Sequence, residues 1–318
     1  MICPLPRHCG IIIYMKKIRC THFFDWGSVP ERFHECVLRE FAENGAHELS
    51  MPNGLAETMM TTPGKAVELR RRLEKTGVTM PDAHGLWSGL WDLGAKDTFM
   101  RAHIAAGHRL CMEIMADFGV KTYTVHIGRG DCVENGGRIS AEMRQRALEI
   151  LEDILPTAER LGIIVCVENQ FSPPSTPLVI ADCISHFGNS PAIGCCIDVG
   201  HAHLMDPDVK RPEGVPIINH DFEQGCWGGH IAEGMFPMKE VFRILAPYIV
   251  TAHVHDNSGM GDEHLSPGQG NCDFDLVFSE LAKCPRLQSV QNETSFAKAG
   301  VSIGHACHLF DGLMSKLG

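Results

Sequence analysis

Strand and helix patterns alternate along the whole chain, and this alternation limits the folds that the chain can adopt. Short apolar runs typical of buried strands are followed by longer amphipathic stretches, several of which end at a glycine, as at Gly45, Gly77 and Gly162. The predicted strands cover residues 18–23, 46–51, 78–83, 120–127, 163–167, 192–197, 249–255 and 288–292. The predicted helices cover residues 29–44, 63–76, 97–118, 140–161, 177–187, 238–247, 274–283 and 301–316.

This order predicts parallel strands, because each helix returns the chain to begin the next strand in the same direction. Eight such units close naturally into a single (β/α)8 barrel, the α/β fold called a TIM barrel. The competing fold is an open, doubly wound sheet, which usually carries a glycine-rich phosphate-binding turn after its first strand. Here that turn reads Phe-Asp-Trp-Gly over residues 24–27, so the barrel is favoured.

We expect one domain over residues 15–318, preceded by an extension over residues 1–14 that contributes nothing to the barrel or to its site. Residues 205–236 are too long for an ordinary strand–helix connection. They are expected to form an insertion that acts as a lid, a specificity element or a partner contact. The alternative is a surface excursion without a role.

Composition and charge disfavour some classes of partner. The formal net charge of −11 argues against a general attraction to nucleic acid or to anionic membranes. No apolar run approaches the roughly 18 residues that a membrane span needs. The 14 cysteines are scattered and form no CxxC pair, which predicts reduced thiols in a cytoplasmic protein. A homo-oligomer is compatible with these features.

Side chains that can bind a metal follow the predicted strands from the third to the eighth. In chain order they are His84, His126, Glu168, Asp198, His201, His253, His255, Asp262, His264 and Glu293. The carboxyl ends of the strands of a barrel meet at the face that carries the active site. Grouping so many carboxylates and imidazoles there is costly through desolvation and like-charge repulsion, and divalent cations remove that cost. The pattern therefore predicts a metal site, with room for more than one ion.

Five segments carry a resemblance to the xylose isomerase-like barrel superfamily, which includes sugar isomerases and epimerases and also endonuclease IV. They are Val-Cys-Val-Glu-Asn (165–169), Ile-Asp-Val-Gly-His (197–201), His-Val-His-Asp-Asn (253–257), Asp-Glu-His-Leu-Ser-Pro-Gly-Gln-Gly (262–270) and Asn-Glu (292–293). The resemblance covers residues 17–318. It implies that one metal ion is held by Glu168, Asp198, His253 and Glu293, as in the sugar epimerases.

Two further implications concern the remaining histidines and acids. His255 lies two residues beyond His253, on the same face of a strand, so it is the alternative ligand; His201 would then contact the substrate. The surplus residues His84, His126, Asp262 and His264 resemble the extra ligands with which endonuclease IV builds a three-zinc cluster. The chain lacks, however, a dense basic stretch that could bind along a phosphate backbone. Lys210-Arg211 is the one pair of basic residues in the insertion.

The leading hypothesis is a divalent-metal-dependent isomerase or epimerase that acts on a small sugar or sugar phosphate. Glu168 and Glu293 would transfer protons on opposite faces of an enediolate, as the resemblance implies. One alternative is a multinuclear zinc hydrolase of phosphoesters, and another is a barrel that keeps its metal only to bind a ligand or partner. Carboxylate ligands suit Mn²⁺, Mg²⁺ or Co²⁺, and the many histidines favour Zn²⁺.

Predicted substrate contacts surround these residues. Trp87 and Trp91 are expected either to form an apolar wall for one face of a sugar or to pack at the top of the barrel. Arg129 is expected to contact a hydroxyl or phosphate group, or to form an ion pair with Asp131. His201 and His255 complete the predicted set.

Overall fold

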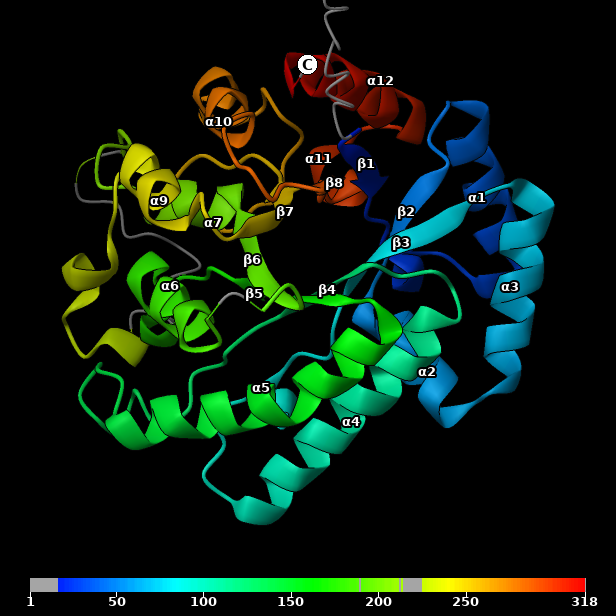
Figure 1. Ribbon diagram of the computed structural model, residues 1–318. Coiled ribbons are helices and arrows are strands. Elements are labelled where there is room, and N and C mark those ends of the chain that lie inside the picture. Colours follow the sequence, from blue (N-terminus) through cyan, green and yellow to red (C-terminus); the bar gives the residue numbers. More distant parts are fainter. Residues whose placement is uncertain (1–16, 189, 212, 214–224, 318) are drawn as a thin grey trace, which may run out of the picture.

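The computed structural model describes residues 17–188, 190–211, 213 and 225–317, so the extension expected over residues 1–14 lies outside the described residues. The strands form one closed barrel in the order of the sequence, and all neighbours are parallel (Figure 1). They are β1 (Arg19–His22), β2 (Glu48–Met51), β3 (Thr79–His84), β4 (Thr122–Val125), β5 (Ile164–Glu168), β6 (Ile193–Asp198), β7 (Ile249–Val254) and β8 (Ser289–Asn292). The expected TIM barrel is confirmed.

Helices surround the strands, and the long helices α4 and α5 lie side by side (Figure 1). The helices are α1 (His34–Glu43), α2 (Asn53–Thr61), α3 (Gly64–Thr76), α4 (Thr98–Ala116), α5 (Ala141–Leu161), α6 (Pro177–His186), α7 (Val199–Leu204), α9 (Met238–Leu245), α10 (Phe274–Leu281), α11 (Phe296–Ala299) and α12 (Ile303–Met314). In α5 the Ser140 hydroxyl accepts the Met143 N–H, and Gly162 ends the helix with a φ of 66°. Ser140 is thus the N-cap of the helix, and Gly162 is the helix end that the sequence predicted.

Two helices occupy segments that the sequence pattern assigned to loops. Helix α7 follows β6 directly, because the Asp198 carboxylate accepts the His201 N–H and caps the first turn. Helix α2 follows Pro52, and its few buried positions, Ala56 and Met59, give only a weak periodic signal. The residues that follow Asp198 therefore stand on a helical turn, in a segment where no helix was predicted.

The register of the barrel brings distant ligand candidates to one level. Glu168 on β5 pairs with Cys196 on β6, and Asp198 pairs with His253 on β7. Between the strands and the helices lies a continuous apolar core, whose largest fully buried side chains include Tyr123, Phe41, Phe242, Phe278 and Phe310. Burial of each such ring contributes roughly 1.5–3 kcal/mol to the stability of the fold. A well-packed core therefore supports the strands whose carboxyl ends carry the ligand candidates.

Two features bear on the expected environment of the protein. No helix among the described residues combines the length and the apolar character that a membrane crossing requires. All cysteines of the described ranges are free thiols, most of them buried.

His108 on α4 is a buried titratable group beneath the loop that follows β3. Its Nδ1 lies 2.8 Å from the hydroxyl of Tyr123, and this hydroxyl accepts the N–H of Leu86. Burial lowers the pKa of His108 to about 4. A histidine whose pKa is lower in the folded than in the unfolded chain stabilises the fold above the unfolded value of roughly 6.5. That contribution is lost as the pH falls from about 6.5 toward 4.

We therefore expect the free energy of unfolding of H108Q to fall less between pH 7 and pH 5 than that of the wild-type protein. The expected difference is about 2 kcal/mol, measured by urea unfolding at both pH values in the presence of a chelator. H103Q is the matched control, since His103 is an exposed residue of the same helix. Equal losses in H108Q and the wild type would contradict the prediction.

Candidate metal centre

The ten ligand candidates predicted from the sequence gather at the carboxyl end of the barrel. A cavity of about 1250 Å³ opens there, and its wall includes His84, His126, Glu168, His201, Asp262, His264 and Glu293. Asp198, His253 and His255 are fully buried behind that wall. The donor atoms divide into three groups by distance.

The outer group consists of His84, His126 and Glu168. Nε2 of His126 lies 2.7 Å from Oε2 of Glu168, and Nε2 of His84 lies 3.5 Å from the same oxygen. The two Nε2 atoms are 3.1 Å apart. Nδ1 of His84 lies 3.1 Å from the Gly85 carbonyl oxygen, which can only accept, so the ring donates from Nδ1 and turns Nε2 toward Glu168 and His126. Three protein ligands leave a further coordination position open.

The central group consists of Glu168, Asp198, His253 and Glu293, the set implied by the resemblance to sugar epimerases. Nδ1 of His253 lies 3.2 Å from Oε1 of Glu168, 3.3 Å from Oε2 of Glu293 and 4.0 Å from Oδ2 of Asp198. Three carboxylates and one imidazole suit Mn²⁺, Mg²⁺, Co²⁺ or Zn²⁺. Of the two histidines on β7 and just beyond it, His253 is the one that faces this group.

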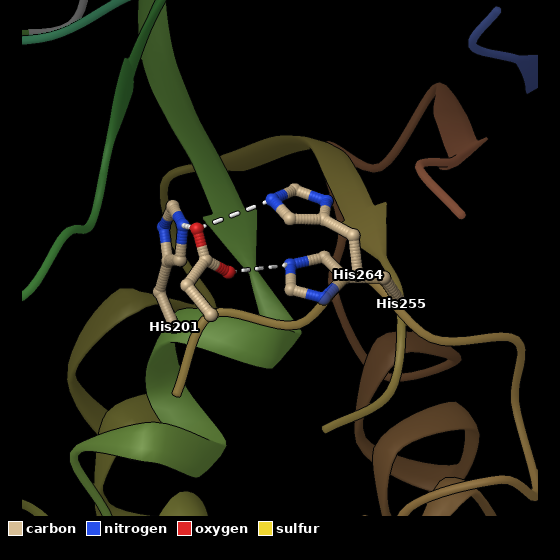
Figure 2. A group of neighbouring side chains, drawn as sticks. His201, His255 and His264 are labelled. Carbon is tan, nitrogen blue, oxygen red and sulfur yellow. Dashed lines mark hydrogen bonds and ion pairs between the residues drawn. The ribbon is translucent and has the colours of Figure 1, made fainter. Parts of the chain in front are cut away.

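The histidine-rich group consists of His201, His255, Asp262 and His264. Figure 2 shows the rings of His201, His255 and His264 around one carboxylate, which belongs to Asp262. Asp262 and His264 come from the loop after β7, and His201 comes from the first turn of α7. His255 was expected among the substrate contacts, but its ring is fully buried against His264 and does not line the cavity.

Two carboxylates connect the three groups. Glu168 directs Oε2 toward the outer group and Oε1 toward His253 of the central group. Asp198 directs Oδ2 toward His253, while its Oδ1 lies 3.2 Å from Nε2 of His255. A carboxylate with one oxygen on each side is suited to bridge neighbouring ions.

Buried polar atoms without partners test whether these residues fit a metal. Oδ2 of Asp198 and both ring nitrogens of His255 are buried and form no hydrogen bond with any described residue. Leaving a buried carboxylate oxygen unsatisfied costs more than the roughly 1–3 kcal/mol of a neutral group. A divalent cation would satisfy these atoms, and the nitrogen and oxygen donors around them are those that such cations bind. The residues therefore fit one or more divalent ions.

Protons compensate the charges of the cluster where no cation does. Burial alone raises the pKa of Glu168, but the nearby His253 and His126 outweigh it and hold this pKa well below its usual range. Burial lowers the pKa of His264, yet the hydrogen bond and charge of Asp262 raise it to about 9. The pKa of His201 is raised well above its usual value because Asp198 and Asp262 outweigh burial. Metal binding would displace these protons, since it takes the neutral imidazole.

The predicted substrate contacts lie beside the cluster. Trp87 is 47 % exposed and its ring centre lies 5.9 Å from that of His126. Trp91 also lines the cavity, with its ring stacked on His103. Arg129 lines the same cavity. Asp131, which was the expected ion-pair partner of Arg129, pairs with Arg146 instead, at 3.1 Å.

Two residues of the site were missed by the sequence analysis because they lie in the irregular segment after β5. The Gln170 side-chain amide lies 3.0 Å from Nδ1 of His126. The ring of Phe171 lies 4.7 Å from that of His201 and lines the cavity. Their position directly after Glu168-Asn169 was the one available signal.

The described part of the insertion over residues 205–236 supports the same segment. Trp227 is buried, and its Nε1–H donates to the Phe171 carbonyl oxygen at 2.8 Å. The segment that carries Trp227 therefore packs behind the wall of the cavity, at the level of His201. This contact agrees with a role in shaping the site, which stays a prediction.

Comparison with known proteins places the chain by sequence and by fold. The family model described as "Xylose isomerase-like TIM barrel" matches residues 38–285. A D-psicose 3-epimerase from Clostridium cellulolyticum H10 is 13% identical with a TM-score of 0.65, covering 94% of this chain and 99% of that chain. A 3-keto-D-glucoside 4-epimerase from E. coli is 15% identical with a TM-score of 0.65, covering 94% and 100%.

A third similar structure, the IOLI protein with a bound zinc atom, is 13% identical with a TM-score of 0.64 and covers 94% of this chain and 97% of that chain. Curated protein sequences give no significant match. At these identities the solved structures establish the barrel fold.

Asp256 holds the loop that carries Asp262 and His264. Its Oδ2 accepts the N–H groups of Gly268 and Gly270 at 2.9 and 2.8 Å, and its Oδ1 accepts those of Asn257 and Cys272. His264 has a left-handed φ of 50°, a conformation that a non-glycine residue keeps only when its surroundings hold it.

We expect D256N to destabilise the protein by about 2–4 kcal/mol, because an amide NH2 then faces backbone N–H donors that lose their acceptor. Hydrogen exchange followed by mass spectrometry should show faster exchange concentrated in residues 257–272. D273N is the matched control, since Asn also caps α10. Unchanged exchange of residues 257–272 in D256N would show that Asp256 does not hold this loop.

Proposed function

The chain belongs to the family of xylose isomerase-like TIM barrels, and from this premise we propose that it is a divalent-metal-dependent isomerase or epimerase of a small sugar or sugar phosphate. The observation that carries the proposal is the pair Glu168 and Glu293, from β5 and after β8. Both line the cavity and both approach Nδ1 of His253, at 3.2 and 3.3 Å. The sugar epimerases among the structures of similar fold support the same class of substrate.

The central group would hold the ion, through Glu168, Asp198, His253 and Glu293. A divalent ion bound there polarises a substrate carbonyl and makes the neighbouring carbon-bound hydrogen more acidic. Surrounding histidines hold the pKa values of Glu168 and Glu293 below the usual range although burial opposes them, so both are ionised. One carboxylate accepts the carbon-bound proton. The other carboxylate takes up a proton from water and delivers it to the opposite face, which inverts that carbon, and the first then releases its proton to solvent.

The walls of the cavity suit a hydroxylated ring. Trp87, Trp91 and Phe171 offer aromatic faces, and Arg129 offers hydrogen-bond donors for a hydroxyl or phosphate group. Lys65 and Arg72 also line the cavity, and both pair with Glu31, at 2.9 and 3.1 Å. Aromatic faces with a few polar groups are the lining that small-molecule sites have.

A second candidate function is a multinuclear zinc hydrolase of phosphoesters. The observation that favours it is the position of Glu168 and Asp198 between neighbouring groups of ligands. Two ions roughly 3.5–4 Å apart would suit in-line attack of water on a phosphate. The net charge of −11 and the absence of a basic stretch in the sequence argue against a long nucleic-acid substrate.

We expect E168Q and E293Q each to reduce exchange of the substrate's α-hydrogen with solvent by at least about 10²-fold, because the amide cannot accept the proton. The measurement is NMR of candidate ketoses and their phosphates incubated in D2O with metal-loaded protein. E31Q is the matched control, since Glu31 lines the cavity and its carboxylate pairs with Lys65 and Arg72 and not with a ligand candidate. Full exchange in both variants would exclude the proposed mechanism.

We also expect a chelator to abolish turnover and a divalent metal to restore it. Titrating Mn²⁺ or Zn²⁺ into the metal-free protein, with bound metal counted by mass spectrometry, gives the number of ions at which activity returns. Recovery of sugar turnover at one ion per chain supports the epimerase. Phosphodiester cleavage that appears only at two or more ions supports the hydrolase, and tight ligand binding without turnover supports a binding barrel.

A further inference from the structure

The cavity is larger than the proposed reaction of a small sugar requires. Its volume of about 1250 Å³ exceeds the roughly 300–1,000 Å³ of pockets that enclose a drug-sized ligand. A monosaccharide is smaller than such a ligand, so it fills only part of this cavity. The rest of the cavity is lined by residues that are not ligand candidates.

This further part of the cavity is lined by segments that follow β1 and β2. They are the segment before α1, helix α2 and helix α3. In the closed barrel β1 lies opposite β5 and β2 lies opposite β6, and β5 and β6 carry Glu168 and Asp198. Figure 1 shows α2 and α3 on the blue and cyan side of the barrel, and α7 and β7 on the side across from them. The cavity therefore extends across the mouth of the barrel, from the ligand candidates to α2 and α3.

Apolar side chains form much of the wall of this further part. We call it the apolar arm and define it by residues that all line the cavity, Val29, Leu55, Met59, Leu69 and Trp91. Val29, Leu55 and Trp91 are half-buried, so part of each side chain faces the cavity rather than the core. Apolar surface that meets water in a concave site gains free energy when a ligand covers it. The arm is thus suited to a ligand group that has an apolar face.

Trp91 gives the apolar arm a rigid aromatic wall. Its Nε1–H donates to Oε1 of Glu57 at 3.3 Å, and its ring stacks on that of His103 with centroids 5.3 Å apart. At Gly107 on α4 an added Cβ would come within 2.3–2.7 Å of the Trp91 ring, so only glycine there leaves room for it. A ring held in this way loses little conformational entropy when a flat ligand group packs on it.

The charged residues beside the apolar arm compensate one another. Nζ of Lys65 lies 2.9 Å from Oε2 of Glu31 and 3.1 Å from Oε2 of Glu68. Nη2 of Arg72 lies 3.1 Å from Oε1 of Glu31. Two cations thus lie beside two carboxylates, and this set of residues has no net charge with which to attract a phosphate. The ligand group that suits the arm is therefore neutral.

Two polar side chains accompany the apolar ones. Asn53 and Thr58 also line the cavity, and Oγ1 of Thr58 donates to the Gly54 carbonyl oxygen at 2.8 Å. The Thr58 hydroxyl is thereby left to accept a hydrogen bond from a ligand. A few placed polar groups in an apolar wall fix the orientation of a bound molecule. A hydroxylated ring with an apolar face, such as a second sugar ring, meets both requirements.

We propose that the substrate is a sugar that carries a second, neutral sugar ring, and that this ring binds in the apolar arm while the reacting sugar lies at the central group. The apolar face of the second ring packs on Trp91 and Leu55, and one of its hydroxyls donates to Thr58. The inference rests on the proposed function for the identity of the reacting sugar. Binding in the arm is measured without turnover.

Calorimetric titration of metal-loaded protein compares D-fructose with lactulose and isomaltulose, two neutral disaccharides that carry a second ring on different hydroxyls of the same ketose. We expect one of the disaccharides to bind at least about 10-fold more tightly than D-fructose, because a further ring face is covered. L55D should remove this difference and leave the affinity for D-fructose unchanged, since it places a charge in the wall of the arm. L110D is the matched control, because Leu110 is an exposed leucine of α4 outside the lining of the cavity.

A second probe separates this inference from the proposed reaction. The ¹⁹F NMR signal of 4-fluorophenyl β-D-glucopyranoside should broaden with metal-free wild-type protein and with L110D, but not with L55D. If neither disaccharide binds more tightly than D-fructose and the fluorine signal does not respond, the inference is overturned, while α-hydrogen exchange that depends on Glu168 and Glu293 would still support the reaction. Equal broadening by L55D and wild type would also overturn it. Tighter binding of a disaccharide that L55D abolishes, without any α-hydrogen exchange, would support the arm and exclude the reaction.

Discussion

Glu168 and Asp198 place two carboxylates where water does not reach, and an unpaired buried charge costs several kcal/mol. The structure meets this cost by surrounding both with imidazoles from other strands, and the raised pKa of His253 and the lowered pKa of Glu168, each opposed by burial, are two sides of that compensation. Every other ligand candidate at the rim lies in a group that includes or touches one of these two acids. The arrangement of histidines around these two carboxylates follows from this need for positive charge.

The barrel makes such a concentration of charge tolerable because its backbone sets the positions of the ligands. The register of the parallel strands places Asp198 beside His253. The apolar core behind the strands holds the strands in position. The loop after β7 lacks that support, so it relies on four backbone N–H groups bound by Asp256. The same residue thus compensates for the absence of a strand ladder where Asp262 and His264 are needed.

The sequence was sufficient to predict the barrel and the ten residues at its rim, because strand–helix alternation and strand ends are local signals. It was not sufficient to divide those residues into groups. The two-residue period of a strand suggested that His255 could replace His253, but β7 ends at Val254. Beyond that residue the period no longer applies, and His255 turns to His264 instead. Gln170 and Phe171 depend on a loop path and on the contact with Trp227, which no local pattern encodes.

The sharing of Glu168 and Asp198 between groups also bears on how such a rim can change over generations. His84 and His126 belong only to the outer group, and His255 and His264 only to the histidine-rich group. A lineage can therefore lose either of these groups through single substitutions while the central group stays intact. Loss of Glu168 or Asp198 damages two neighbouring groups at once. Divergence toward a new chemistry would thus begin at the edges of the rim, with the two shared acids the last to be replaced.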